Sequence, residues 1–359
     1  MHSSTSSSSD DAYTRLLPET ANWRRILSLT ISVTIIGISG TEYYARSQNY
    51  PVLFETSPDL WATQWFRFEA SKDDQTVIVG ASRNKFGLVI DLWEKEKGTR
   101  PIMLAWPASS PLPVLHRIAE RENYRGTIIC GIAPSFSFAS SKHPQQRWIQ
   151  DNLKTTEILR YSLSYYISTP ARRFLKHRLR SLNTGAFSPI FNLRDSLHLE
   201  NRKGTRVPLQ PIFWANQRED LQDVYLESAA SNEFMMEQIR DMWRRIMLEQ
   251  IFYGTADMDL LVGEYVHAVQ RIKEKGGRVI FIRHPSSDDF LDFEREHYPR
   301  EQFFDRVVNE TCCFGIHFED YPEISNYSCP EWSHLTADDA RDYTQKIIKI
   351  ITEHSPDAI

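Results

Sequence analysis

The chain has 359 residues, of which 41% are hydrophobic and 25% charged, and its formal net charge at pH 7 is -5. This length and composition suit a globular protein with one large domain or two smaller ones. The small excess of acidic residues and the lack of a long run of like charges argue against a nucleic-acid partner.

The N-terminal region carries a membrane signal. Residues 1–22 begin with a run of serines and contain few apolar side chains, so we predict a disordered tail. Residues 23–45 contain an uncharged apolar stretch that follows Arg24 and Arg25, which predicts a transmembrane signal anchor. The two arginines favour a cytoplasmic N-terminus, with the rest of the chain on the far side of the membrane. A cleaved signal peptide, or a buried core helix, is the alternative.

The four cysteines do not form a recognisable pattern. Cys312 and Cys313 are adjacent and cannot easily bond each other, and Cys130 lies in an apolar, strand-like run. The paired C-x-x-C spacing of a structural zinc site is missing. We therefore predict neither a disulfide framework nor a metal site.

After the anchor, residues 46–75 have the polar and aromatic composition of a linker. An alternation of apolar runs and helical patterns follows. The predicted strands cover 76–79, 101–105, 127–132, 278–283 and 315–318, and the predicted helices between and after them include 84–95, 113–122 and 336–351. Short apolar runs without polar alternation are typical of a parallel sheet that is buried on both faces. We predict an α/β fold over 76–355, a flavodoxin-like three-layer α/β/α arrangement around a five-stranded parallel sheet.

The region between the third and fourth strands is too long for one crossover helix, so we predict an insertion at about 141–275. Its pattern is mainly helical, at 145–168, at 170–182 and from about 217 to 275 with a break near Gly254. The second of these segments is basic. Its cluster fits contact with acidic lipid or polymer, but balance by acids elsewhere favours a solvated helix face. The cluster consists of Arg172, Arg173, Lys176, His177, Arg178 and Arg180.

Two short segments carry candidate chemistry. Ser82 comes just after the first predicted strand, at the sheet edge where reactive groups gather in α/β proteins. His334 follows Glu331 by three residues, just before the last helix. A serine hydroxyl needs a base to take its proton, and the base needs an acid to orient it, so these residues could form a hydrolytic triad. In the alternative, Ser82 is only a helix N-cap. Glu319 and Asp320 compete with Glu331 as the acid.

Together, Gly80-Ala81-Ser82-Arg83 and Glu331-Trp332-Ser333-His334-Leu335 resemble two sequence blocks of the SGNH (GDSL-like) hydrolase superfamily. The Gly-x-Ser form of the first block is most similar to that of members that modify cell-envelope polysaccharides and teichoic acids. The resemblance covers 76–352 apart from the insertion. Three features depart from the pattern: Glu331 stands where Asp is usual, the glycine of the second block has no clear counterpart, and the Gly-x-Asn expected after the third strand is missing.

The resemblance implies roles for individual residues. Ser82 would be the nucleophile, His334 the base and then the acid, and Glu331 the residue that orients the imidazole. Oxyanion donors, from the backbone or the side chain, would come from Ser82, Ser109 and Ser135, through the backbone N–H groups in the case of Ser82 and Ser109. Arg83 and Arg283 would contact the substrate, Arg283 from the carboxyl end of the fourth strand. The alternative for Arg283, which we favour, is a pairing with Asp288 or Asp289.

The implied function is that of a membrane-anchored esterase or O-acyltransferase. It would act on an acetyl-like ester of a cell-envelope glycan, or on a small ester, through an acyl-Ser82 intermediate and without a metal or organic cofactor. Partners would belong to envelope polysaccharide machinery. The rival interpretation is a scaffold or binding protein that kept the fold and lost catalysis.

Overall fold

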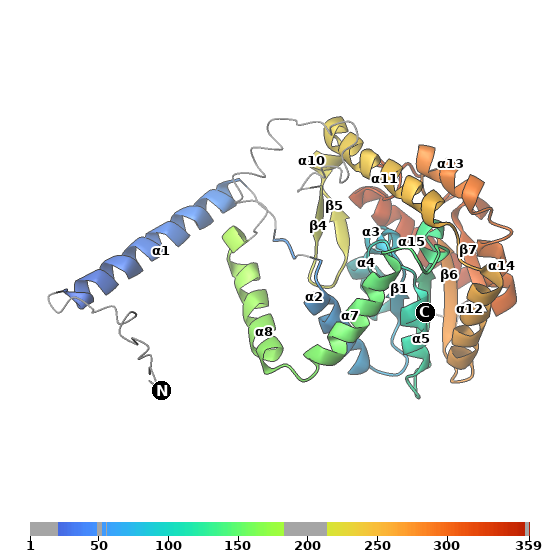
Figure 1. Ribbon diagram of the computed structural model, residues 1–359, viewed down its shortest axis with the longest axis horizontal. Coiled ribbons are helices and arrows are strands. Elements are labelled where there is room, and N and C mark those ends of the chain that lie inside the picture. The colour runs from blue at the N-terminus through green and yellow to red at the C-terminus, as the bar shows by residue number, and fades with distance from the viewer. Residues whose placement is uncertain (1–20, 49–51, 55, 183–213, 356–358) are drawn as a thin grey trace, which may run out of the picture. The chain divides into compact units, whose positions relative to one another are not determined.

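The computed structural model describes residues 21–48, 52–54, 56–182, 214–355 and 359. It divides into two compact units, Met1–Tyr50 and Pro51–Ile359. Figure 1 shows the helices and strands of both units.

The described part of the first unit is a single helix, α1 (Trp23–Ser47). The side chain of Asn22 caps its start by accepting a hydrogen bond from the backbone N–H of Arg25, at 3.2 Å. Its length and apolar composition are sufficient to cross a membrane, and none of its most apolar window is buried. It therefore fits the predicted membrane anchor, and it does not fit a buried core helix.

The second unit is built on a five-stranded parallel sheet, as predicted. The strand order is β2-β1-β3-β6-β7, and every neighbouring pair is parallel. All residues of β1 and β3 are buried, which explains their unbroken apolar sequence. The strands are β1 (Val77–Val79), β2 (Ile102–Met103), β3 (Thr127–Gly131), β6 (Arg278–Arg283) and β7 (Phe314–His317).

The strand order reverses between β1 and β3. From β1 the chain moves outward to β2, and it then returns past β1 to β3. With right-handed crossovers, the helices after β1 and the helix after β2 lie on opposite faces of the sheet. Accordingly α15 (Ala337–His354) packs on α3 (Ser82–Gly87) and α4 (Ile90–Lys97), whereas α12 (Met258–Lys273) packs on α5 (Leu112–Ala119) and β6. Ligands of such sheets bind where the order reverses, at the carboxyl ends of the strands.

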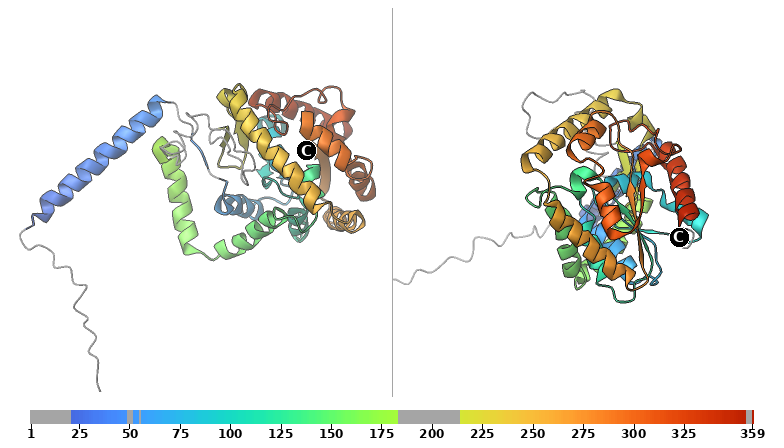
Figure 2. Two further views of the ribbon diagram at one scale, coloured as in Figure 1. Left: turned by 45° about the horizontal axis from the view of Figure 1, so that its top comes forward. Right: turned by 90° about the vertical axis from the view of Figure 1, so that its right-hand side faces the viewer.

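The remaining helices complete the second unit, and Figure 2 shows it from two further directions. Two of them lie between β6 and β7 in the chain, namely α13 (Asp288–His297) and α14 (Phe304–Thr311). The short elements are α6 (Pro134–Ser137), α10 (Glu227–Ala230) and the 3-10 turns at Arg180–Leu182 and Phe318–Asp320. All four cysteines are free thiols.

The segment expected as a linker contains helix α2 (Pro58–Glu69). Trp61, Trp65 and Phe68 are buried, and Nε1 of Trp61 donates to the carbonyl of Leu104 at 3.0 Å. Phe66 is only partly buried. The aromatic side chains thus pack on the sheet domain, and the second unit begins before this helix, at Pro51.

The insertion differs from the expected run of helices in three places. Two helices replace the one predicted at 145–168. The first is α7 (Gln146–Leu159), and the second is α8 (Leu163–Arg178), whose start is capped by the side chain of Ser162. Pro170, expected to start a helix, lies inside α8. The part predicted as helix from 217 begins as an antiparallel hairpin, β4 (Ala215–Gln217) with β5 (Asp223–Tyr225). The break expected near Gly254 is confirmed, because α11 (Glu233–Tyr253) ends there.

The hairpin is held by a buried lysine that belongs to the sheet domain. Lys85 is fully buried, and its Nζ lies 2.7 Å from a carboxylate oxygen of Asp223 and 3.2 Å from Oε1 of Gln217. Gln222, in the turn, accepts a hydrogen bond from the backbone N–H of Ile90 at 3.0 Å. These distant contacts stabilise strands that the local sequence does not specify. The hydrogen bond between Gln222 and Ile90 also helps to separate α3 from α4, whereas the sequence predicts one helix at 84–95.

Candidate active site

Ser82 lies at a sharp turn between β1 and α3. Gly80 has a φ of +139°, and a Cβ on it would lie 2.7 Å from the carbonyl oxygen of Gly131, so only glycine fits there. The N-cap of α3 is Ala81, which makes no side-chain cap, and Ser82 is the first helical residue. The interpretation of Ser82 as an N-cap therefore does not fit.

The side chain of Ser82 meets His334 instead. Its Oγ lies 2.8 Å from Nε2 of His334, although 252 positions separate the two residues in the sequence. On the other side of the ring, Nδ1 of His334 lies 2.8 Å from Oε1 of Glu331. Hydroxyl, imidazole and carboxylate thus form one continuous chain of hydrogen bonds, which is the geometry that activates a serine.

Glu331 is fully buried and accepts three hydrogen bonds. Its Oε1 also accepts from the backbone N–H of His334 at 2.7 Å, and its Oε2 accepts from Nε1 of Trp243. The guanidinium of Arg240, one turn before Trp243 on α11, donates to the carbonyl of Pro330 through Nη2 at 2.6 Å. The insertion therefore holds the acid in place. Sequence reasoning missed both residues, and the only local signal was a tryptophan within a strongly charged helix.

An aromatic wall surrounds the imidazole. The ring centroid of His334 lies 4.3 Å from that of Phe86 and 5.7 Å from those of Trp214 and Trp243. Trp214, just before β4, stacks on Phe86 with a centroid distance of 5.2 Å. Ser82 is only 7% exposed and His334 only 3%, so the reactive groups lie in a nearly closed, water-poor site.

Arg83 and Arg283 both pair with one buried carboxylate. Oε2 of Glu294 lies 3.1 Å from Nη1 of Arg83 and 2.6 Å from Nη2 of Arg283, and it accepts a hydrogen bond from Ser286 at 2.9 Å. Arg83 also donates to the hydroxyl of Ser333 at 3.2 Å. Because Arg83 is next to Ser82 and Ser333 is next to His334, this cluster ties the two halves of the triad together.

The positive charges of Arg83 and Arg283 stabilise the ionised carboxylate of Glu294. Burial alone would raise the pKa of Glu294, but the positive charges of Arg283 and Arg83 outweigh it and lower this pKa below its ordinary value. Burial lowers the pKa of Arg283 to about 10. The carboxylate that pairs with Arg283 in the described part of the chain is Glu294, and not Asp288 or Asp289 as the sequence had suggested. Both arginines are only 3% exposed, so they stabilise the interior of the site and do not line its entrance.

The two other serines expected near the oxyanion are fully buried. Ser109 donates to the carbonyl of Pro107 at 3.2 Å, and Ser135 lies 3.5 Å from Oε1 of Glu294. Their hydroxyls are therefore engaged with the protein.

The competing acids pair elsewhere. Glu319 bonds Arg295, and Asp320 bonds Arg300 at 2.7 Å. Of the three candidate acids, Glu331 is the one that meets His334.

Asn84 was not singled out by the sequence. Its side chain fills the space beside two glycines, since a Cβ on Gly131 would lie 1.6 Å from its Oδ1 and one on Gly80 would lie 2.6 Å away. Its Nδ2 is buried without a hydrogen-bond partner among the described residues. A glycine at the end of each of two neighbouring strands is the signal that could have indicated a side chain crossing above them.

No known protein family matches the chain, and no curated protein matches it either. The resemblance seen in the two short segments therefore remains an expectation. The function has to be argued from the geometry of the site.

Proposed function

We propose that this protein is a serine-dependent esterase or O-acyltransferase of the SGNH type that acts on an acyl ester of a glycan. The observation that carries the proposal is the hydrogen-bonded series of Ser82, His334 and Glu331, with both distances at 2.8 Å. The sheet order and the place of Ser82 after its first strand also agree with a three-layer SGNH domain over 76–355 that carries the insertion.

The reaction would proceed in two halves. With a proton on Nδ1 held by Glu331, Nε2 of His334 takes the proton of the Ser82 hydroxyl as Oγ attacks the ester carbonyl. The resulting imidazolium gives that proton to the leaving alcohol oxygen, and the C–O bond of the ester breaks to leave acyl-Ser82. Water or a sugar hydroxyl then attacks the acyl group, again losing its proton to His334. Ser82 recovers its proton, and an acid or a new ester is released.

The negative charge that develops on the carbonyl oxygen needs hydrogen-bond donors. The backbone N–H of Ser82 is one candidate. The amide of Asn84 is a second, because it is buried and unpartnered close in sequence to the nucleophile. It would replace the asparagine missing after the third strand.

The location follows from the anchor. The pair Arg24 and Arg25 precedes the apolar part of α1, which favours a cytoplasmic N-terminus and a catalytic domain beyond the membrane. A cell-envelope glycan is the substrate class that this location and the SGNH resemblance favour.

A fluorophosphonate probe tests the proposal. We expect the full-length protein to form a covalent adduct, located by peptide mass spectrometry at Ser82, with Ser82→Ala as the unreactive control. If Ser82 stays unmodified under conditions that label an ordinary serine esterase, the proposed function is wrong. Discharge of the acyl group onto water or onto an added sugar then separates an esterase from a transferase.

The low exposure of Ser82 favours a second candidate, a scaffold or binding protein that has lost catalysis. Such a protein would retain the packing of Ser82 against His334. It would bind glycan without reacting with the probe, so the same experiment decides between the two functions.

Trp243→Phe should slow labelling about tenfold, which corresponds to losing one hydrogen bond to a charged group. Phenylalanine keeps the stacking on Phe290, where the ring centroids lie 5.0 Å apart, but it cannot donate to Glu331. The measurement is the second-order rate constant of probe labelling. Trp93→Phe is the matched control, because Trp93 is also buried and its Nε1 has no partner among the described residues. Equal rates for both variants would contradict a positioning role for Trp243.

A further inference from the structure

Helix α8 presents an apolar stripe to solvent. Leu163, Ile167 and Phe174 are 73%, 65% and 60% exposed. Their spacing places them on one face of the helix, and Tyr166, at 52%, lies beside them. The opposite face carries Tyr165, which is buried and whose hydroxyl lies 2.8 Å from that of Thr63 on α2.

The stripe is accompanied by positive charge alone. Residues 161–182 contain five arginines and lysines and no aspartate or glutamate. An exposed apolar face with a basic polar face is typical of helices that lie in the interface of a bilayer. A helix that merely faced water would carry polar residues at the stripe positions instead.

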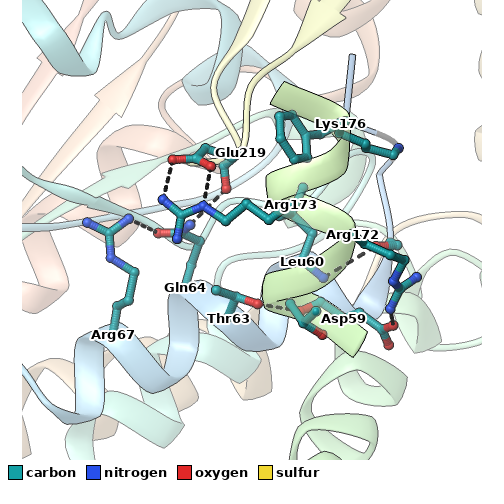
Figure 3. A pocket seen from close by; sticks show the side chains of 12 residues that line it. Asp59, Leu60, Thr63, Gln64, Arg67, Arg172, Arg173, Lys176 and Glu219 are labelled. Atoms are coloured by element: carbon teal, nitrogen blue, oxygen red, sulfur yellow. Dashed lines mark hydrogen bonds and ion pairs between the residues drawn. The ribbon is translucent and has the colours of Figure 1, made fainter. Parts of the chain in front are cut away.

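Ion pairs join α8 to α2 and to the turn of the β4–β5 hairpin (Figure 3). Arg172 pairs with Asp59 at 2.8 Å, and Arg173 pairs with Glu219 through two hydrogen bonds of 2.5 and 2.6 Å. Both arginines point toward the pocket between α8 and α2, yet their side chains remain 59% and 56% exposed. The stripe is thereby held outward, away from the body of the second unit.

The covalent chain keeps α8 within a short reach of the candidate membrane helix. Lys176 donates to the carbonyl of Leu53 at 3.4 Å, and its Nζ lies 5.7 Å from the ring centroid of Phe54. Leu53 follows Ser47, the last residue of α1, by six positions. Whatever the arrangement of the two units, six residues span at most roughly 22 Å when extended.

We propose that α8 lies on the surface of the bilayer that holds α1, with its apolar stripe in the interface and its cations at lipid phosphates. The occupant of this face is a phosphate-rich, anionic lipid surface. Charge complementarity supports this choice, because the five arginines and lysines of the segment outnumber the two carboxylates, Asp59 and Glu219, with which Arg172 and Arg173 pair. The proposal does not depend on the function of the candidate active site.

The test uses the full chain in nanodiscs made of equal parts phosphatidylcholine and phosphatidylserine, some of them with a nitroxide on the acyl chains. Ile167→Cys, in a Cys312→Ser background, carries an environment-sensitive fluorophore that the nitroxide quenches on contact. Leu260→Cys is the matched control, since Leu260 is 70% exposed and lies on α12, at the other end of the second unit (Figure 1). The unsubstituted background gives the baseline.

We expect the fluorophore at Ile167 to shift to the blue and to lose most of its emission to the nitroxide lipid, while that at Leu260 does neither. Equal, weak quenching at both positions would overturn the proposal. A blue shift at Ile167 without quenching would also overturn it, because the stripe would then be covered by protein. Quenching that is unchanged in pure phosphatidylcholine would overturn the role assigned to the cations.

Discussion

Glu331→Gln should lower the rate of fluorophosphonate labelling about 10⁴-fold, the size of effect seen when the acid of a serine triad becomes an amide. Oε1 of Glu331 accepts from Nδ1 of His334 at 2.8 Å, which keeps the ring proton on that nitrogen. The glutamine amide group can donate to Nδ1 and thereby move the ring proton to Nε2. The imidazole then cannot take the proton of Ser82. The measurement is the second-order rate constant of labelling.

Glu331→Asp is the matched control for this prediction. It retains the negative charge and shortens the side chain by one methylene, so a substantial part of the reactivity should remain. A Glu331→Gln protein that labels within tenfold of the unsubstituted protein would show that Glu331 is not the acid of the site.

Glu294→Gln should lower the free energy of unfolding by about 3–5 kcal/mol, because it leaves two buried guanidinium groups without their carboxylate. Arg83, Arg283 and Glu294 are all at most 3% exposed. Water therefore cannot replace the lost partner. Denaturant unfolding of the detergent-solubilised full chain, followed by tryptophan fluorescence, measures the loss.

Asp342→Asn is the control, since Asp342 pairs with Lys346 at 2.6 Å but the pair is exposed. We expect this variant to lose less than about 1 kcal/mol. A similar loss for the two variants would contradict the central role of the Glu294 cluster.

Acid should weaken the same cluster. The pKa of Glu294 is lowered in the folded state from its ordinary value of 4.5, so its stabilisation is complete above that pH. The stabilisation is lost as the pH falls through the lower folded-state pKa. The difference in unfolding free energy between the unsubstituted and Glu294→Gln proteins should therefore shrink below pH 4.5. A difference that stays constant from neutral pH into that range would count against the ionised carboxylate.

The sheet could be predicted from the sequence because its strands are short, mainly apolar without polar alternation, and bounded by helical patterns. Arg278–Arg283 has the predicted bounds, and the other strands differ by one or two residues at one or both ends. The helix break between α3 and α4 could not be predicted in this way. It depends on two distant side chains, Gln222, which accepts from the backbone N–H of Ile90, and Thr344, which accepts from that of Val89 across 255 positions.

Parts of the candidate site were likewise beyond local patterns. Ser82, Glu331 and His334 belong to two recognisable segments. Trp243 contacts Glu331 from a helix of the insertion, 88 positions away. The partner of Arg283 was missed because Asp288 and Asp289 are closer in sequence, whereas Glu294 is the carboxylate on α13 that is buried.

The contacts of His334 have different origins along the chain, and this has a consequence for the order of folding. Its pairing with Glu331 closes a loop of three residues, whereas its meeting with Ser82 brings together positions 252 apart. Local loops close at a small entropic cost, and distant ones close only after much of the sheet has assembled. We therefore expect the pairing of His334 with Glu331 to form earlier in folding than its contact with Ser82. Under the proposed function, Ser82 would gain its reactivity only when the domain is complete.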